Sequence, residues 1–289
     1  VLMKFFHGIL LMQVLPKNSC SGSGNMPKKK LSLLTAVRSV LAAESVNIKE
    51  VYAVKVRIKF TKTGHMKFVG HLDTMRYFQK AIRRAGLPVA FSGGYSPHMI
   101  MSFAAPLGVG TTSLGEYFDM ELTETLSTDV IEQRLNAVMV DGVSVCSARH
   151  VEDGKASTAM ALVAAADYFV CFREGKEPLA SDWQQRITEF LAQKEITVIK
   201  KTKRSEKIID IRPFIYKMQA DGNGVFMQLA SASSNYTKPE LVLDTFLHWM
   251  GEEPASFAYM IERREVYANK GTDEKPSFVS LESLGDKVE

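Results

Sequence analysis

Residues 52–61 read Tyr-Ala-Val-Lys-Val-Arg-Ile-Lys-Phe-Thr, and this stretch sets the expected fold. Apolar and polar side chains alternate along it with a period of two, which is typical of a β-strand with one buried face. One face carries valine, isoleucine and phenylalanine, and the other carries Lys55, Arg57 and Lys59. The pattern therefore predicts a strand whose apolar side packs on a core and whose cationic side points away from it.

The elements expected after this strand occur in an order that repeats. In the first half we expect a helix over 71–85, strands over 99–104 and 115–122, a helix over 128–138 and a strand over 143–150. In the second half we expect a strand over 167–173, a helix over 182–193, extended segments over 196–203, 212–219 and 225–231, a helix over 238–250 and a strand over 258–267. The sequence therefore predicts an α+β fold of two ferredoxin-like β-α-β-β-α-β halves in tandem, a pseudo-repeat.

Composition divides the 289 residues into five expected segments. These are a poorly ordered N-terminal extension (1–50), a first ferredoxin-like half (51–151), a linker (152–166), a second half (167–268) and a polar C-terminal tail (269–289). The apolar run at residues 5–15 resembles the core of an export signal, but it is too short to span a bilayer and no clean cleavage site follows. We therefore expect a cytoplasmic protein, with export as the alternative.

The three cysteines, Cys20, Cys146 and Cys171, lie far apart and form no CxxC pair. This spacing excludes a disulfide scaffold, a zinc ribbon and a self-contained iron–sulfur cluster. With 46% hydrophobic and 24% charged residues, the chain is able to form a sizeable core. We expect no metal ion and no cofactor in this chain.

Charge is distributed unevenly although the formal net charge is only +4. Residues 51–100 hold many lysines and arginines against one acidic residue, Asp73, and a second basic block spans 200–217. Such segregation indicates either a polyanion site or two faces of the protein that attract each other. On the strand, RNA phosphates are one way to neutralise adjacent cations, and acidic side chains such as Asp119 and Glu121 are the other. The nucleic-acid candidates are Lys55, Arg57, Lys59, Arg76, Lys80, Arg83, Arg84, Tyr95, Ser96 and His98.

Residues 92–98, Ser-Gly-Gly-Tyr-Ser-Pro-His, form a glycine-rich loop before the predicted second strand. Flexible backbone of this kind can approach a phosphate closely, and Tyr95 can stack on an unpaired base. A plain turn that needs positive φ at glycine explains the same residues.

His65, His71 and His98 fall in the same basic region and are weak candidates for the acid and base of RNA cleavage. Together with Asp73 they are also metal-ligand types, although their spacing fits no established ligand pattern. Histidines of this kind are more often ordinary polar or capping residues, and that interpretation is the favoured one for each of the three. We interpret Asp210-Ile211-Arg212-Pro213 as holding a structural ion pair at the start of a strand.

Several separated motifs resemble the bacterial radical SAM-linked protein family. They are residues 60–64 (FTKTG), 67–73 (KFVGHLD), 81–88 (AIRRAGLP), 92–98 (SGGYSPH), 210–213 (DIRP) and 261–265 (IERRE). The resemblance covers about residues 53–267 and implies a domain of unknown function, encoded beside or fused to a radical S-adenosylmethionine protein. Because this chain has no CxxxCxxC triad, the resemblance implies an accessory protein whose partner is a radical S-adenosylmethionine enzyme.

Three functions remain open on the sequence. The first is a non-catalytic RNA-binding or substrate-presenting partner of a radical S-adenosylmethionine enzyme. The second is a metal-independent endoribonuclease resembling the enzymes that process CRISPR repeat transcripts, an analogy of architecture only. The third is a protein–protein adaptor that binds no nucleic acid.

Overall fold

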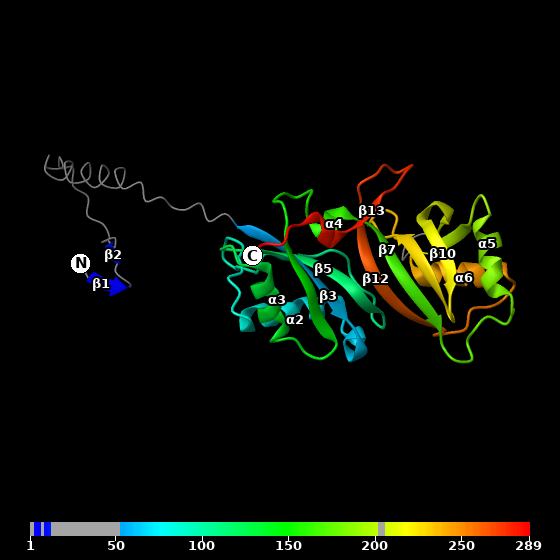
Figure 1. The fold of residues 1–289 in the computed structure, drawn as a ribbon, viewed down its shortest axis with the longest axis horizontal. Coiled ribbons are helices and arrows are strands. Elements are labelled where there is room, and N and C mark those ends of the chain that lie inside the picture. The colour runs from blue at the N-terminus through cyan, green and yellow to red at the C-terminus, as the bar shows by residue number, and fades with distance from the viewer. Residues whose placement is uncertain (1–2, 7–8, 13–52, 202–205) are drawn as a thin grey trace, which may run out of the picture. The chain divides into compact units, whose positions relative to one another are not determined.

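A mixed sheet of nine strands runs through the computed structural model, which describes residues 3–6, 9–12, 53–201 and 206–289 (Figure 1). Its main path follows the order β10-β11-β7-β12-β5-β3-β6, with β4 added beside β5 and β13 beside β12. Residues 51–289 form one unit, so the two predicted halves share a single sheet. The α+β class predicted from the sequence is confirmed at this level.

The first half consists of β3 (Val54–Lys62), α2 (His71–Arg84), β4 (Met101–Phe103), β5 (Thr112–Leu122), α3 (Thr128–Asn136) and β6 (Val143–His150). Its strands are antiparallel neighbours in the order β4-β5-β3-β6. A short 3-10 helix, η1 (Gly64–Phe68), fills the turn between β3 and α2. All five regular elements predicted after the first strand are present, with ends that differ by a few residues.

The second half consists of β7 (Val163–Phe172), α5 (Trp183–Leu191), β8 (Thr197–Lys201), β9 (Glu206–Asp210), β10 (Ile215–Asp221), β11 (Gly224–Ala230), α6 (Pro239–Trp249) and β12 (Tyr259–Asn269). Along the sheet its strands follow the antiparallel order β10-β11-β7-β12. The pair β8–β9 forms a separate two-stranded sheet, of which the sequence pattern predicted only the first strand.

The two halves join where β12 runs parallel to β5. Glu262 pairs with Thr112, and Arg263 pairs with Ser113. The strands approach so closely that a Cβ atom on Gly115 would lie 2.7 Å from the backbone oxygen of Arg264. Glycine at this position is therefore required by space.

The helices pack on the apolar side of the sheet that the strand pattern predicted. Val56 and Ile58 of β3 are fully buried against Phe78 and Ile82 of α2, with residues of α3 in the same core. A second core lies around Val170 of β7 and includes residues of α5 and α6. Figure 1 shows α2 and α3 along the lower edge of the first half and α5 and α6 at the other end of the sheet.

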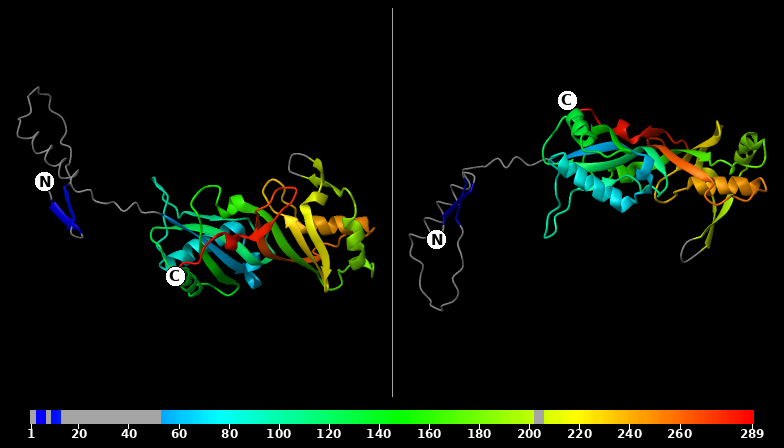
Figure 2. Two further views of the ribbon diagram at one scale, coloured as in Figure 1. Left: turned by 45° about the horizontal axis from the view of Figure 1, so that its top comes forward. Right: turned by 90° about the horizontal axis from the view of Figure 1, so that it is seen from below.

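The opposite side of β3 is covered by segments that the sequence assigned to a linker and a tail. In the linker, residues 159–162 form α4 (Ala159–Leu162). After β12 the chain forms β13 (Phe278–Ser280) and a 3-10 helix, η3 (Leu281–Leu284), whose Leu281 is fully buried. Both views of Figure 2 show this red C-terminal segment returning across the first half. The expected polar tail is therefore wrong for residues 278–288, because the segment packs on the sheet and ends with a hydrogen bond from Thr128 N to Val288 O.

In the N-terminal segment, β1 (Met3–Phe6) and β2 (Ile9–Met12) pair antiparallel. The rest of the predicted extension lies outside the described residues. Within the described ranges, no helix has both the length and the apolar character needed to cross a membrane.

Candidate nucleic-acid interface

The cationic side of β3 is buried, and its arginine is already paired. Arg57 is 1% exposed, and its Nε and Nη2 donate to Oδ1 and Oδ2 of Asp119 at 2.8 and 3.1 Å. Its other hydrogen bonds reach the backbone oxygens of Ser157 and Leu281. The expectation that this side stands open for a polyanion is therefore wrong for Arg57, and Asp119 neutralises it as the alternative predicted.

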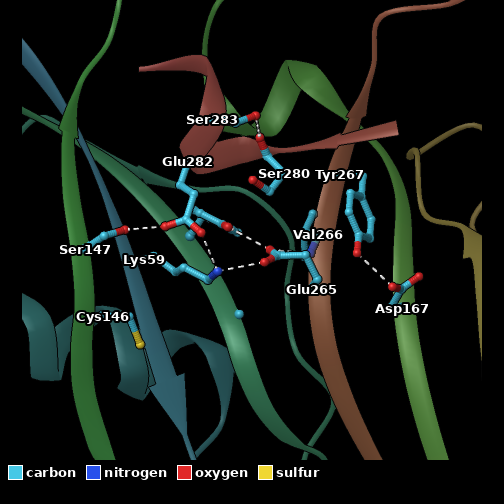
Figure 3. A network of polar contacts seen from close by, with 12 residues as sticks. Lys59, Cys146, Ser147, Asp167, Glu265, Val266, Tyr267, Ser280, Glu282 and Ser283 are labelled. Atoms are coloured by element: carbon cyan, nitrogen blue, oxygen red, sulfur yellow. Dashed lines mark hydrogen bonds and ion pairs between the residues drawn. The ribbon is translucent and has the colours of Figure 1, made fainter. Parts of the chain in front are cut away.

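Lys59 connects three segments that are distant in the sequence (Figure 3). Its Nζ lies 2.7 Å from Oε2 of Glu265 in β12 and 2.7 Å from Oε1 of Glu282 in η3. Glu265 also accepts a hydrogen bond from the hydroxyl of Tyr117, and Glu282 accepts one from Ser147 Oγ at 2.6 Å. These contacts hold the C-terminal segment on the sheet, so Lys59 is not free for an outside anion.

In this network, the pKa values of Lys59 and Glu282 are set more by their charged and hydrogen-bonding neighbours, taken together, than by burial. Burial lowers the pKa of Lys59, but the hydrogen bonds and charges of Glu265 and Glu282 outweigh it and raise that pKa overall. Burial raises the pKa of Glu282, but hydrogen bonds from Lys59 and Ser147 outweigh it and lower that pKa overall. Both pKa shifts favour the charged forms, which keeps the ion pair intact near neutral pH.

A second buried ion pair lies at the junction of the two halves and was not foreseen from the sequence. Arg263 of β12 donates from Nε and Nη2 to both carboxylate oxygens of Glu116 at 2.7 and 2.6 Å. The nearby Lys62 is buried and donates to the backbone oxygen of Val69. Burial lowers the pKa of Lys62, with partial opposition from the charge of Glu116. The only advance signal was the IERRE motif, which contains Arg263.

The exposed face of α2 keeps cations that no carboxylate neutralises. Arg76 pairs with Asp73 at 3.0 Å on the surface, and Arg84 donates to the backbone oxygen of Val138. The side chains of Lys80 and Arg83 are exposed, and within the described ranges neither has a recorded hydrogen bond or ion pair. This helix, and not the strand, is therefore where accessible positive charge remains.

The loop at residues 92–98 has a fixed base and an open tip. Ser92 Oγ lies 2.8 Å from His98 Nδ1, and Ser92 N donates to His98 O at 2.9 Å. Gly94 has φ of +101°, a conformation that favours glycine, as the turn interpretation predicted. Tyr95 at the tip is fully exposed, and Ser96 beside it is exposed as well. The loop therefore presents an aromatic ring on a closed turn.

The three histidines lie in separate surroundings. His65 is exposed in η1, His71 packs edge-on against Phe103, and His98 contacts Ser92. Among the residues that the structure describes, no group of three or more His, Cys, Asp or Glu is placed to hold a metal ion, and Asp73 pairs with Arg76. A catalytic role for any of these histidines remains a prediction.

The predicted ion pair between Asp210 and Arg212 is not formed. Asp210 Oδ1 accepts hydrogen bonds from the backbone nitrogens of Ile196 and Arg212. The Arg212 guanidinium donates to the backbone oxygens of Leu191 and Ile215, at the 3-10 helix η2 (Arg212–Phe214). Both side chains stabilise a turn through backbone groups instead of pairing with each other.

The fold and its paired interior define an α+β protein with a sheet that is covered on both sides of β3. Residues 55–239 match the profile of DUF2344, described as an uncharacterized protein conserved in bacteria. The match spans more than half of the chain, so the chain belongs to this family. No curated protein matches it. The family description contains no reference to radical S-adenosylmethionine chemistry, so that association remains a proposal.

Proposed function

We propose that this protein binds RNA without cleaving it, on a surface formed by the exposed side of α2 and the tip of the 92–98 loop. We call this the α2–loop surface and define it by Lys80, Arg83, Arg84, Tyr95 and Ser96. The observation that supports the proposal is the exposure of Lys80 and Arg83 without carboxylate partners in the described chain. The candidates on β3 are withdrawn from this surface because Arg57 and Lys59 serve internal ion pairs and Lys55 is buried, with its Nζ donating to the backbone oxygen of Gly154.

The physical argument combines charge with stacking. Lysine and arginine side chains that neutralise phosphates release counterions, which supplies much of the affinity of RNA-binding proteins. An exposed aromatic ring such as Tyr95 adds a stacking platform for an unpaired base. Only residues 85–91 separate α2 from the loop, which limits their separation to about 28 Å even at full extension. This short spacing supports the proposal that one stretch of single-stranded RNA contacts both elements.

Two finer proposals accompany this function. We propose a tandem ferredoxin-like pseudo-repeat, supported by the corresponding antiparallel strand orders β4-β5-β3-β6 and β10-β11-β7-β12. We also propose a radical S-adenosylmethionine enzyme as the partner to which RNA or another substrate is presented. That partner is supported by the sequence resemblance alone, and co-purification with such an enzyme from a bacterial lysate tests it.

Fluorescence anisotropy with labelled single-stranded RNA tests the RNA proposal. We expect the double variant Lys80→Glu, Arg83→Glu to bind RNA at least about tenfold more weakly than the native protein, because it reverses two accessible charges. Lys176→Glu, Lys194→Glu makes the same change of net charge on exposed residues of the second half and is the matched control.

If the two double variants lose RNA affinity equally, the α2–loop surface is refuted as a specific site, and net charge alone explains the binding. Absence of RNA binding at low salt would favour the adaptor function. The integrity of the RNA is followed in the same samples. Cleavage that His98→Ala or His71→Ala abolishes would replace the proposal with the endoribonuclease function.

A further inference from the structure

A cavity of about 100 Å³ lies at the junction of the two halves, beside the start of α6. Residues of β7 and β12 line it, together with the 107–111 loop and the segment 236–240. Liquid water occupies about 30 Å³ per molecule, so the cavity has room for a group of a few heavy atoms. It is too small for a whole drug-sized ligand, which needs about 300 Å³ or more.

Two buried donors from neighbouring strands line this cavity. Arg263 of β12 and Tyr168 of β7 are direct cross-strand partners, so their side chains point to the same side of the sheet. Arg263 is 1% exposed and Tyr168 is 2% exposed. The bonds from Arg263 to Glu116 account for two of the five N–H donors of a guanidinium, which leaves three for other partners.

The hydroxyl of Tyr168 is buried without a hydrogen-bond partner. Burial lowers the pKa of Arg263, but Glu116 and the neighbouring hydroxyl of Tyr168 outweigh burial and raise that pKa overall. The hydroxyl therefore lies beside the guanidinium, yet it makes no hydrogen bond of ordinary geometry with any residue that the structure describes. Buried hydroxyl groups ordinarily have a partner, and a ligand oxygen bound next to Arg263 supplies one.

The start of α6 adds further donors to the same cavity. The helix begins at Pro239, and no side chain caps it, since Lys238 at the N-cap position makes no such hydrogen bond. The first backbone N–H groups of a helix lack partners within the helix, and together with the helix dipole they favour an anion. The exposed side chain of Lys238 lines the cavity as well.

The charges around the cavity leave an excess of one positive charge. The charges of Glu116 and Arg263 both act on the pKa of the buried Lys62, so these groups form one buried cluster of two cations and one carboxylate. Glu240 also lines the cavity, and Lys238 beside it balances its charge. Because a buried charge is ordinarily compensated, this cluster favours an anion in the cavity.

We infer that this cavity binds one phosphate group, held by Arg263, the hydroxyl of Tyr168, Lys238 and the start of α6. A phosphate is small and anionic, and its several acceptor oxygens match donors that converge from two strands and a helix. The group belongs either to inorganic phosphate or to a phosphate monoester whose remainder lies outside the cavity. The inference is separate from the proposed RNA binding, because the α2–loop surface contributes no residue to the cavity.

Calorimetric titration and thermal unfolding of the full chain with inorganic phosphate test the inference, with chloride at matched ionic strength as the comparison. We expect saturable binding in the millimolar range or below. The Tm should rise with phosphate concentration, because the ligand binds the folded state and not the unfolded one. Absence of saturable binding beyond the effect of chloride would overturn the inference.

Tyr168→Phe keeps the buried ring and removes only the hydroxyl. We expect it to weaken phosphate binding about fivefold or more, because a hydrogen bond to a charged ligand is lost. Without phosphate the variant should be at least as stable as the native protein, since the hydroxyl has no partner in the described chain. The matched control is Tyr117→Phe, which removes a hydroxyl that donates to Glu265 and should lower stability without changing phosphate affinity. Native phosphate affinity in Tyr168→Phe would overturn the inference.

A second variant tests the site from its exposed rim, where a substitution does not disturb the core. Lys238→Gln should weaken phosphate binding about threefold or more, because it removes one accessible cation. Lys176→Gln makes the same change at an exposed position of the second half and should leave the affinity unchanged. Equal loss in the two variants would show a general effect of surface charge and would overturn the inference.

The source of the phosphate is decided by comparing inorganic phosphate with ribose 5-phosphate in the same titration. Tighter binding of inorganic phosphate, lost in Tyr168→Phe, assigns the cavity to the free anion. Tighter binding of ribose 5-phosphate, lost in the same variant, assigns it to a phosphate monoester. Phosphate binding without RNA binding would refute the proposed function and leave this site intact, and the reverse result would refute only the site.

Discussion

Replacement of Asp119 by asparagine isolates the structural role of the β3 cations. Asp119→Asn preserves the shape of the side chain and removes the charge that faces Arg57, which is 1% exposed. Breaking a buried ion pair from one side costs about 3–5 kcal/mol, because the remaining charge stays buried without compensation. Arg57 retains its bonds to the backbone oxygens of Ser157 and Leu281, so we expect the lower end, about 3 kcal/mol.

Urea denaturation followed by circular dichroism measures this loss as a lower unfolding midpoint at unchanged slope. The matched control is Asp73→Asn, which breaks the exposed pair with Arg76, whose two side chains are 65% and 70% exposed. An exposed pair of this kind contributes less than about 1 kcal/mol. If Asp119→Asn destabilises the protein no more than Asp73→Asn does, the pairing is not structural and Arg57 returns to the list of RNA-binding candidates.

Three further predictions concern the interior and its charges. Glu282→Gln should weaken the dependence of protein stability on pH at acid pH. The lowered pKa of Glu282 contributes stability that is present above the ordinary pKa of the carboxyl group and is lost as pH falls through its pKa in the folded protein. Denaturation midpoints between about pH 3 and 7 measure this dependence, and the same dependence in the variant and the native protein would contradict the prediction. Gly142→Ala should lower the free energy of unfolding by about 1–3 kcal/mol, because Gly142 has φ of +88° and a Cβ atom there would lie 2.7 Å from Thr63 O. Gly86→Ala is the control, since Gly86 has φ of +62° but no atom within 4 Å of a Cβ. Urea denaturation should show a smaller loss of stability for Gly86→Ala than for Gly142→Ala. The Cys146 side chain is exposed, but partial desolvation by the surrounding protein raises the pKa of its thiol. Its alkylation by iodoacetamide, in a background with the other two cysteines replaced by serine, should therefore have a higher pH midpoint than that of a free cysteine peptide, and a midpoint at or below the peptide's would contradict this.

The parts of the fold that follow from local periodicity could be predicted from the sequence. The apolar side of β3 is buried as its alternation requires, and β6 (Val143–His150) has the predicted ends. Helices α2 and α3 follow from their apolar stripes and from the glycine, proline and serine residues at their ends. Each of these signals lies within a window of about ten to fifteen residues.

The parts that depend on distant segments could not be predicted in the same way. The alternation of apolar and cationic residues in β3 predicts an amphipathic strand, but it contains no information about which segments cover the polar side of that strand. That cover comes from Ser157, Leu281 and Glu282, and the last two belong to a segment polar enough to resemble a tail. Asp119 was named as a possible partner because antiparallel neighbours place acids opposite bases, whereas Glu265 and Glu282 lie more than 200 positions away from Lys59.

The candidate site changed for the same reason. The sequence shows how many lysines and arginines lie in residues 51–100, but it does not show which of them are buried. In the structure some are internal and others are accessible. Arg57 and Lys62 are buried, Lys59 is half-buried within its ion pairs, and Lys80 and Arg83 are exposed on α2. A helix wheel separates such faces from sequence, whereas a strand with two covered faces gives no comparable signal.

The dependence of RNA affinity on salt tests the central proposal most directly. Each phosphate neutralised on a single strand contributes about 0.7 to the slope of log K against log salt concentration. Lys80→Gln, Arg83→Gln should therefore reduce the magnitude of that slope by about 1.4, and Lys176→Gln, Lys194→Gln should leave it unchanged. A slope that is the same in the native protein and in the α2 variant would show that RNA does not contact this helix.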